Sequence, residues 1–193
     1  MMRILITPPE ITADEPQRVR MALDAGWDAV HLRHPEASTT DMRRLIEAIP
    51  QGYHSRLHLH GHFALTNEFN LGGLHLNGRC PAAPENYTGT LSATCHTVGE
   101  VAALAGSPRV AYVTLSPIFP SVSKSGYAPS SALTGSLHEL AAAAHPPVIA
   151  LGGITPLTLP LLDPEIFQGY AVLGYFAQAA DISDFARRLA EFR

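Results

Sequence analysis

The stretch "LHLHGHFALTNEFNLGGLHL", which runs from Leu57 to Leu76, decides the expected fold. Two short runs, 56–60, which begins one residue before the stretch, and 73–76 have the length of strands. Residues 63–69 between them have the pattern of a short helix. A strand, a helix and a second strand in this order favour a parallel βα unit.

The same alternation of apolar runs and helical stretches continues along the whole chain. Strands are expected at 3–7, 28–33, 56–60, 73–76, 90–95, 110–115, 147–151 and 170–173. Helical segments are expected at 14–25, 40–49, 63–69, 98–105, 131–144, 157–162 and 182–192. Residues 77–86, rich in Pro, Gly and Asn, indicate an irregular connection in place of the fourth helix. We therefore predict a compact α/β fold, a (β/α)8 TIM barrel in which residues 1–193 form a single domain.

Composition and charge narrow the classes of function. The chain is 46% apolar and 16% charged, which is typical of a soluble globular protein. A net charge of −4 argues against a nucleic-acid partner. No apolar run is long enough to span a membrane, and two cysteines give no framework of disulfides. We expect a cytoplasmic protein and leave the oligomeric state open, with a homodimer as one alternative.

Glycines follow the last two strands, in "PVIALGGI" (147–154) and "AVLGYF" (171–176). In barrels of this class, the loops after strands seven and eight commonly hold a phosphate group. We therefore predict phosphate binding by the backbone at Gly152, Gly153, Gly174 and Tyr175. The alternative is that these glycines only turn the chain.

The loop after the sixth strand contains Lys124, the chain's single lysine. Ser121 and Ser123 lie in the same loop. The lysine is either a solvated surface residue or the cation of a lid that closes over an anionic ligand.

Five stretches resemble motifs of one enzyme family. They are "AVHLRHP" (29–35), "GGLHL" (72–76), "TCHTVGEVAAL" (94–104), "YVTLSPIFPSVSKSGY" (112–127) and "VIALGGIT" (148–155). In this order they resemble the thiamin phosphate synthase family, which includes a thiazole tautomerase (TenI-like) branch. The resemblance implies a (β/α)8 barrel that binds a phosphorylated thiazole.

The resemblance also shows what this chain lacks. The family's synthases use Mg²⁺, held in part by an Asn-Asp pair that falls on His60 and Gly61 here. A second acid of the family falls on Cys80. Magnesium requires oxygen ligands, so the resemblance implies that the usual magnesium site is missing. We therefore predict no cofactor, with Mg²⁺ as an alternative if the chain is a true synthase.

Histidines stand where part of that site is expected. Strand alternation directs His58 and His60 into the barrel and Leu57 and Leu59 toward the helices. A metal-dependent barrel hydrolase is an alternative, because His60 with His31, His75 or His96 offers nitrogen ligands for zinc. We assign no metal ligands, because the last strand ends on glycine rather than on the aspartate usual in such hydrolases.

The chain keeps the predicted phosphate turns but lacks the carboxylates that would bind magnesium in the family's synthases. This combination favours a magnesium-independent thiazole tautomerase in thiamine biosynthesis. Histidine suits acid–base chemistry near neutral pH, and in the tautomerase branch a histidine at the place of His96 serves this role. The predicted catalytic residues are His96, Lys124 and Arg33. The predicted substrate-binding residues are His31, His60, Thr94, Ser121 and Ser123. The alternatives are a divergent thiamin phosphate synthase and a non-catalytic regulator that binds a phosphorylated ligand.

Overall fold

The computed structural model describes residues 1–121, 128–142 and 144–192, and in it eight parallel strands close into a barrel. Each strand pairs with its neighbours in sequence, and the last strand pairs with the first to complete the ring. The strands are β1 (Met2–Ile6), β2 (Ala29–Leu32), β3 (Leu57–Leu59), β4 (Gly73–Leu76), β5 (Thr90–Cys95), β6 (Val110–Leu115), β7 (Val148–Leu151) and β8 (Gly169–Val172). The predicted (β/α)8 TIM barrel is confirmed.

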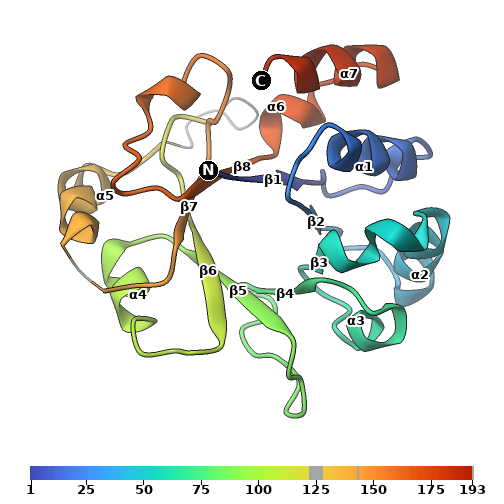
Figure 1. Ribbon diagram of the computed structural model, residues 1–193, viewed down its shortest axis with the longest axis horizontal. Helices are drawn as coiled ribbons and strands as arrows, with labels where there is room; N and C mark the ends of the chain where they lie inside the picture. The colour runs from blue at the N-terminus through green and yellow to red at the C-terminus, as the bar shows by residue number, and fades with distance from the viewer. Residues whose placement is uncertain (122–127, 143, 193) are drawn as a thin grey trace.

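Helices surround the ring of strands (Figure 1). The α-helices are α1 (Glu15–Asp24), α2 (Thr39–Ala48), α3 (Ala64–Phe69), α4 (Val98–Ala103), α5 (Ser131–Ser136), α6 (Gly174–Ala177) and α7 (Ile182–Ala190). The 3-10 helices are η1 (Gln51–Arg56), η2 (Leu137–Ala141) and η3 (Leu159–Leu161). The helix expected over 131–144 is two shorter pieces, α5 and η2, and residue 143 lies outside the described residues.

The connection from β4 to β5 confirms that the fourth helix is missing. Residues 77–89, all of which the structure describes, form no helix. The segment begins with an isolated antiparallel bridge between Asn77 and Cys80. This bridge brings Cys80 back toward the end of β4, at the mouth of the barrel formed by the carboxyl ends of the strands.

Four of the α-helices, α2, α4, α5 and α7, begin at side chains that cap their first turn, and α2 and α4 illustrate the contact. The Ser38 hydroxyl accepts a hydrogen bond from the Asp41 N–H at the start of α2, at 3.1 Å. The Thr97 hydroxyl accepts one from the Glu100 N–H at the start of α4, also at 3.1 Å. Such caps satisfy N–H groups that a helix leaves without partners, so each helix starts at a defined distance from its strand.

The core has an outer and an inner part. The outer part lies between strands and helices, where Leu57 and Leu59 pack in one cluster with Met42 and Ile46 of α2, as strand alternation predicts. A small apolar cluster lies inside the barrel and consists of Ile4, Ile6, Ala29, Tyr112, Ile149 and Ala171. Polar side chains fill the rest of the buried interior from β2 to β6, including His31, His58, His75, Ser92 and Thr114.

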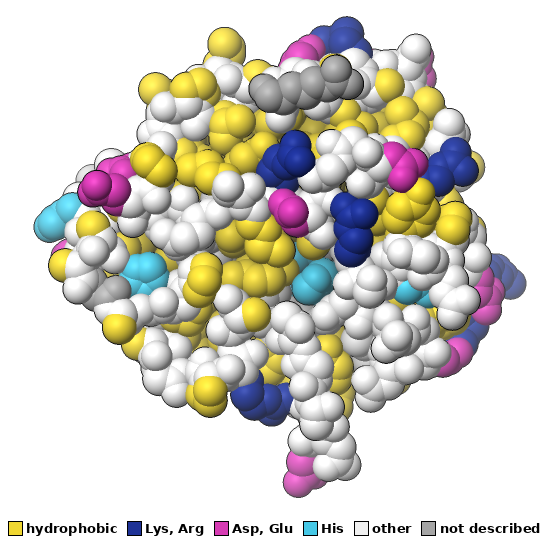
Figure 2. Space-filling model, in the orientation of Figure 1, with side chains coloured by type: hydrophobic (Ala, Val, Ile, Leu, Met, Phe, Trp, Pro, Cys, Tyr) yellow, Lys and Arg dark blue, Asp and Glu magenta, His cyan; other side chains and the backbone are white. Residues whose placement is uncertain are grey.

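The surface gives two further observations. None of the described helices is long and apolar enough to cross a membrane. On the face that Figure 2 shows, basic side chains lie singly, several of them next to acidic ones, and form no broad basic patch.

Gly73 makes room for one of the interior histidines. It pairs with His58 across β3 and β4. A Cβ atom at Gly73 would lie 2.7 Å from the Thr90 carbonyl oxygen and 2.8 Å from His58 Nδ1. Real Cβ atoms do not approach other atoms so closely, so a side chain at this position would displace the histidine or the strand.

We therefore expect Gly73→Ala to lower the free energy of unfolding by ~1–3 kcal/mol, the usual cost of overpacking. Gly106→Ala is the control, because a Cβ there meets nothing within 4 Å. Urea unfolding of both variants checks the difference. Equal stability of Gly73→Ala and the wild type would show that the interior is not closely packed around His58.

Candidate functional site

Four imidazole rings lie close together inside the barrel, near its mouth. His31, His58 and His75 are buried, and His60, at the end of β3, is partly exposed. The ring centres are 4.3 Å apart for His60 and His75, 4.9 Å for His31 and His75, and 5.0 Å for His31 and His58. The structure thus brings together histidines that are far apart in the sequence.

His31 is held from both sides. Its Nε2 lies 2.7 Å from the Tyr112 hydroxyl of β6. Its Nδ1 lies 2.9 Å from His60 Nε2. One imidazole of this pair donates the shared proton and the other accepts it. The ring of His31 therefore has a fixed orientation, with Nδ1 toward the mouth-side histidine.

His75 is held by hydroxyl groups of β5. Its Nδ1 lies 2.8 Å from the Ser92 hydroxyl, and its Nε2 lies 2.8 Å from the Thr94 hydroxyl. Thr94, which the sequence assigned to substrate binding, therefore contacts a histidine in this structure. His58 differs, since its Nδ1 is buried without a hydrogen-bond partner in the described part of the chain.

Burial lowers the pKa of every imidazole in this group, because the apolar interior disfavours the charged form. The pKa of His58 falls to about 4 and that of His75 to about 3. For His31 and His60 the pKa lies well below 6.5, owing first to burial and then to the neighbouring histidines. All four rings are therefore neutral at pH 7.

His96 lies exposed at the mouth of the barrel, directly after β5. Its Nδ1 lies 2.9 Å from the Ser116 carbonyl oxygen. A carbonyl only accepts, so in the neutral ring Nδ1 carries the proton and Nε2 is the basic nitrogen. The Glu100 carboxylate accepts a hydrogen bond from the His96 backbone N–H at 2.5 Å. The structure thus fixes the tautomer that an acid–base histidine needs.

Gly152 and Gly153 form the turn after β7, with φ angles of +94° and +66°. Glycine adopts such angles without strain. A Cβ at Gly152 would lie 2.9 Å from Pro117 Cα, and one at Gly153 would lie 2.4 Å from the Pro120 carbonyl oxygen. The Phe119 N–H also donates to the Gly152 carbonyl at 3.0 Å. Both glycines are therefore required by the turn and its packing, and their phosphate role stays a prediction.

The end of β8 runs into α6, a single turn that starts at Gly174 and was not expected from the sequence. The first N–H groups of a helix have no partner within it, so they suit the predicted phosphate contact. The side chain of Tyr175 points elsewhere: its hydroxyl donates to Glu191, and its ring lies 4.7 Å from the Arg188 guanidinium. Tyr175 can serve the phosphate only through its backbone.

Two guanidinium groups lie near each other at the mouth. Burial and, next, the charge of Arg79 lower the pKa of Arg33. Arg79 is paired with Glu36 at 2.7 Å, whereas half-buried Arg33 has no ion pair in the described part of the chain. A half-buried cation without a carboxylate favours an anionic ligand. The predicted catalytic role of Arg33 stays a prediction.

Positions 61 and 80, where the resemblance places magnesium ligands, are neighbours in space. A Cβ at Gly61 would lie 3.9 Å from Cys80 Sγ. Neither residue offers the oxygen that Mg²⁺ prefers. The two positions are thus close enough to bind one ion together, but their side chains are not magnesium ligands. They do not fit a magnesium ion.

Three predicted residues lie in the loop after β6. Ser123 and Lys124 are outside the described residues, so the predictions for them stay untested. Ser121 is described and partly exposed.

Sequence reasoning missed two residues that organise the site. The Asn77 side-chain amide donates to the His60 carbonyl at 2.8 Å and to the His75 carbonyl at 3.0 Å, which ties the ends of β3 and β4 together. Tyr112 orients His31 from β6. Alternation along β6 could have predicted the inward direction of Tyr112, but the partners of both residues depend on the closed barrel.

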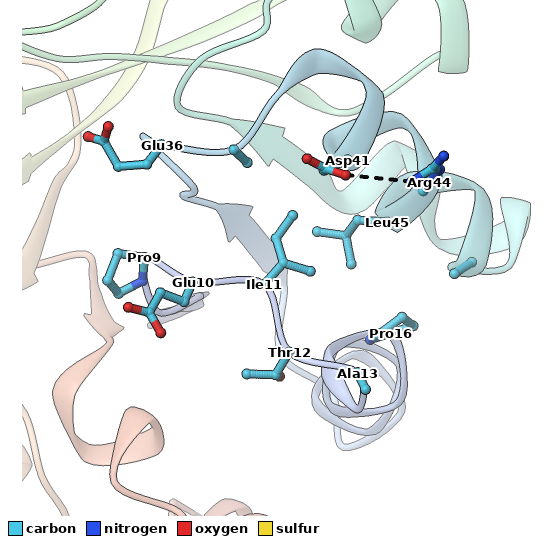
Figure 3. A pocket seen from close by; sticks show the side chains of 12 residues that line it. Pro9, Glu10, Ile11, Thr12, Ala13, Pro16, Glu36, Asp41, Arg44 and Leu45 are labelled. Carbon is cyan, nitrogen blue, oxygen red and sulfur yellow. Dashed lines mark ion pairs between the residues drawn. The ribbon is translucent and has the colours of Figure 1, made fainter.

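A cavity of about 590 Å³ lies beside the mouth, between α1 and α2 (Figure 3). Ile11 and Leu45 point into it, and Glu36 and Asp41 lie at its edge. Its lining includes none of the predicted site residues. Glu36 also pairs with Arg79, so the cavity adjoins the mouth.

A family described as thiamine monophosphate synthase matches residues 3–174, a range that includes all of the strands but the first residue of β1. The chain belongs to this family. The match confirms the resemblance that the sequence motifs indicated.

Individual members of the thiamine monophosphate synthase family are also similar. A thiamine phosphate pyrophosphorylase structure from Bacteroides thetaiotaomicron has a TM-score of 0.86 and 32% identity, covering 99% of this chain and 95% of that chain. A thiamine-phosphate synthase of Lactiplantibacillus plantarum is 36% identical over 90 residues, which is 47% of this chain but only 41% of that protein. One from Alcanivorax borkumensis is 28% identical over 81% of this chain and 76% of its own length.

The lowered pKa values of the buried histidines predict a loss of stability in acid. The unfolded chain binds protons below about pH 6.5, whereas the folded chain does not until the pH nears the lowered values. Stability should therefore fall as the pH drops below 6.5, by up to ~2 kcal/mol at pH 5 for each such histidine. His58→Leu should flatten this dependence.

Urea unfolding of the EDTA-treated protein at pH 5 and pH 8 measures the effect. The same replacement of an exposed histidine, His138→Leu, is the control and should keep the wild-type dependence. If His58→Leu and His138→Leu unfold alike at both pH values, His58 is not the buried neutral group described above.

Proposed function

We propose that this protein binds a phosphorylated thiazole at the mouth of the barrel and interconverts two of its tautomers without Mg²⁺. The observation that carries the proposal is His96, whose Nδ1 is held by the Ser116 carbonyl and whose ring is exposed. A tautomerisation removes a proton from one atom and returns one to another. An imidazole with Nε2 facing the ligand can perform both steps.

The proposed ligand is a carboxythiazole phosphate, which has two anionic groups, a phosphate and a carboxylate. Each group contacts different residues in this proposal. Backbone N–H groups near Gly153 and at the start of α6 donate to the phosphate. The carboxylate pairs with Arg33, the half-buried cation that lacks an ion pair among the described residues. Lys124 would add a cation from the loop after β6, as the sequence predicts.

A second candidate is a divergent thiamine-phosphate synthase. The relatives described above carry that name or the equivalent pyrophosphorylase name. Arg33 and Arg79, with His31 and His60, would then hold the diphosphate of the pyrimidine substrate. Gly61 and Cys80 favour the first candidate, because a synthase of the usual type needs oxygen ligands there.

We predict that His96→Ala lowers the rate of tautomer interconversion by ~10²–10⁴-fold, the usual contribution of a general acid–base group. Calorimetric affinity for thiazole phosphate should change little, because backbone N–H groups and Arg33 still hold the ligand. Lys124→Ala should instead mainly weaken binding. His138→Ala, an exposed histidine away from the mouth, is the control for both measurements.

Assays with both substrate sets, each with and without added Mg²⁺, separate the candidates. The proposal predicts tautomer interconversion without Mg²⁺ and little or no thiamine phosphate. Robust Mg²⁺-dependent formation of thiamine phosphate contradicts it and supports the second candidate. Tight binding of the phosphorylated ligand with neither activity would support the non-catalytic regulator.

A further inference from the structure

Three imidazole nitrogens converge just below the mouth of the barrel. One ring nitrogen from each of His31, His60 and His75 lies within 4.8 Å of the other two. A tetrahedral zinc ion with Zn–N bonds of ~2.0–2.1 Å needs nitrogens about 3.3 Å apart. The His31–His60 pair is at 2.9 Å and the His75 nitrogen lies within 4.8 Å of both, so the rings must rotate for all three nitrogens to bind one ion.

The nitrogens on the far side of two of these rings have hydroxyl partners. His31 Nε2 lies beside the Tyr112 hydroxyl, which leaves Nδ1 toward the cluster. His75 Nδ1 lies beside the Ser92 hydroxyl, and its Nε2 contacts the Thr94 hydroxyl at 2.8 Å, a contact that a metal ion at Nε2 would replace. Metal-binding histidines commonly donate their second N–H to such a partner, which fixes the tautomer and the ring orientation.

The backbone under the cluster is also fixed. Asn77 donates to the carbonyl oxygens of both His60 and His75, so the two strands that carry these ligands are held at one separation. His60 is the partly exposed member and lies on the side of the mouth. An ion could enter past this ring, and its remaining coordination position would face the mouth.

The donor set selects a class of ion. Three imidazoles without a carboxylate suit Zn²⁺ and related first-row transition metals, whereas Mg²⁺ requires oxygen ligands.

We propose that His31, His60 and His75 bind one divalent first-row transition-metal ion, with Zn²⁺ favoured, and that Tyr112 and Ser92 orient two of the ligands. The site shares His60 with the Asn-Asp position of the family's magnesium site but takes its other two ligands from β2 and β4, and it includes neither Gly61 nor Cys80. It does not depend on the proposed function, because metal binding can be measured without any substrate.

The test uses the full chain, stripped with EDTA, dialysed, and titrated with Zn²⁺ and with Co²⁺. We expect one ion per chain and, for Co²⁺, the intense visible absorption of a tetrahedral site. His60→Gln should weaken binding by ~100-fold or more, because it removes one of three ligands. His62→Gln is the matched control, two residues further on and outside the cluster, and should bind normally.

Tyr112→Phe is the second variant, since it keeps the ring and removes only the hydroxyl. It should weaken Zn²⁺ binding by ~10–100-fold while retaining one ion per chain. Circular dichroism confirms the fold of each variant. Absence of stoichiometric Zn²⁺ binding, or equal affinity in wild type, His60→Gln and Tyr112→Phe, overturns the proposal and leaves a hydrogen-bonded histidine cluster.

Discussion

The need to accommodate four clustered imidazoles, three of them buried, governs the interior of this barrel. Parallel barrels usually fill this space with branched apolar side chains, whereas here β2, β3 and β4 direct histidines into it. A buried polar group without a partner costs ~1–3 kcal/mol, so the neighbouring strands supply hydroxyl groups. The Tyr112 hydroxyl contacts His31, and the Ser92 hydroxyl contacts His75. Gly73 supplies the space that the ring of His58 occupies.

The mouth depends on a second set of contacts, which joins three consecutive loops. His96 after β5 bonds to the Ser116 carbonyl after β6, and the next residue, Pro117, packs on Gly152 after β7. His96, the proposed acid–base group, and the predicted phosphate turn therefore belong to one connected structure. The barrel holds both at its mouth.

The sequence predicts each strand end to within one residue, because each strand is a short apolar run between turn-forming residues. It also predicted that Leu57 and Leu59 face outward, because alternation along a strand is a local property. It could not predict the contact of Tyr112 with His31, because the two residues meet only when the sheet closes. Gly152 shows a different limit. A glycine at this position predicts phosphate binding, yet a positive φ angle and packing against Pro117 also require glycine here.

The central claim is that this barrel transfers protons on a phosphorylated thiazole without magnesium. The most direct measurement is ¹H NMR of carboxythiazole phosphate in D₂O with the protein and no added Mg²⁺. The account predicts that solvent deuterium enters the thiazole at a rate proportional to protein concentration. No deuterium incorporation above the protein-free rate, under conditions where calorimetry shows the ligand to be bound, would contradict it.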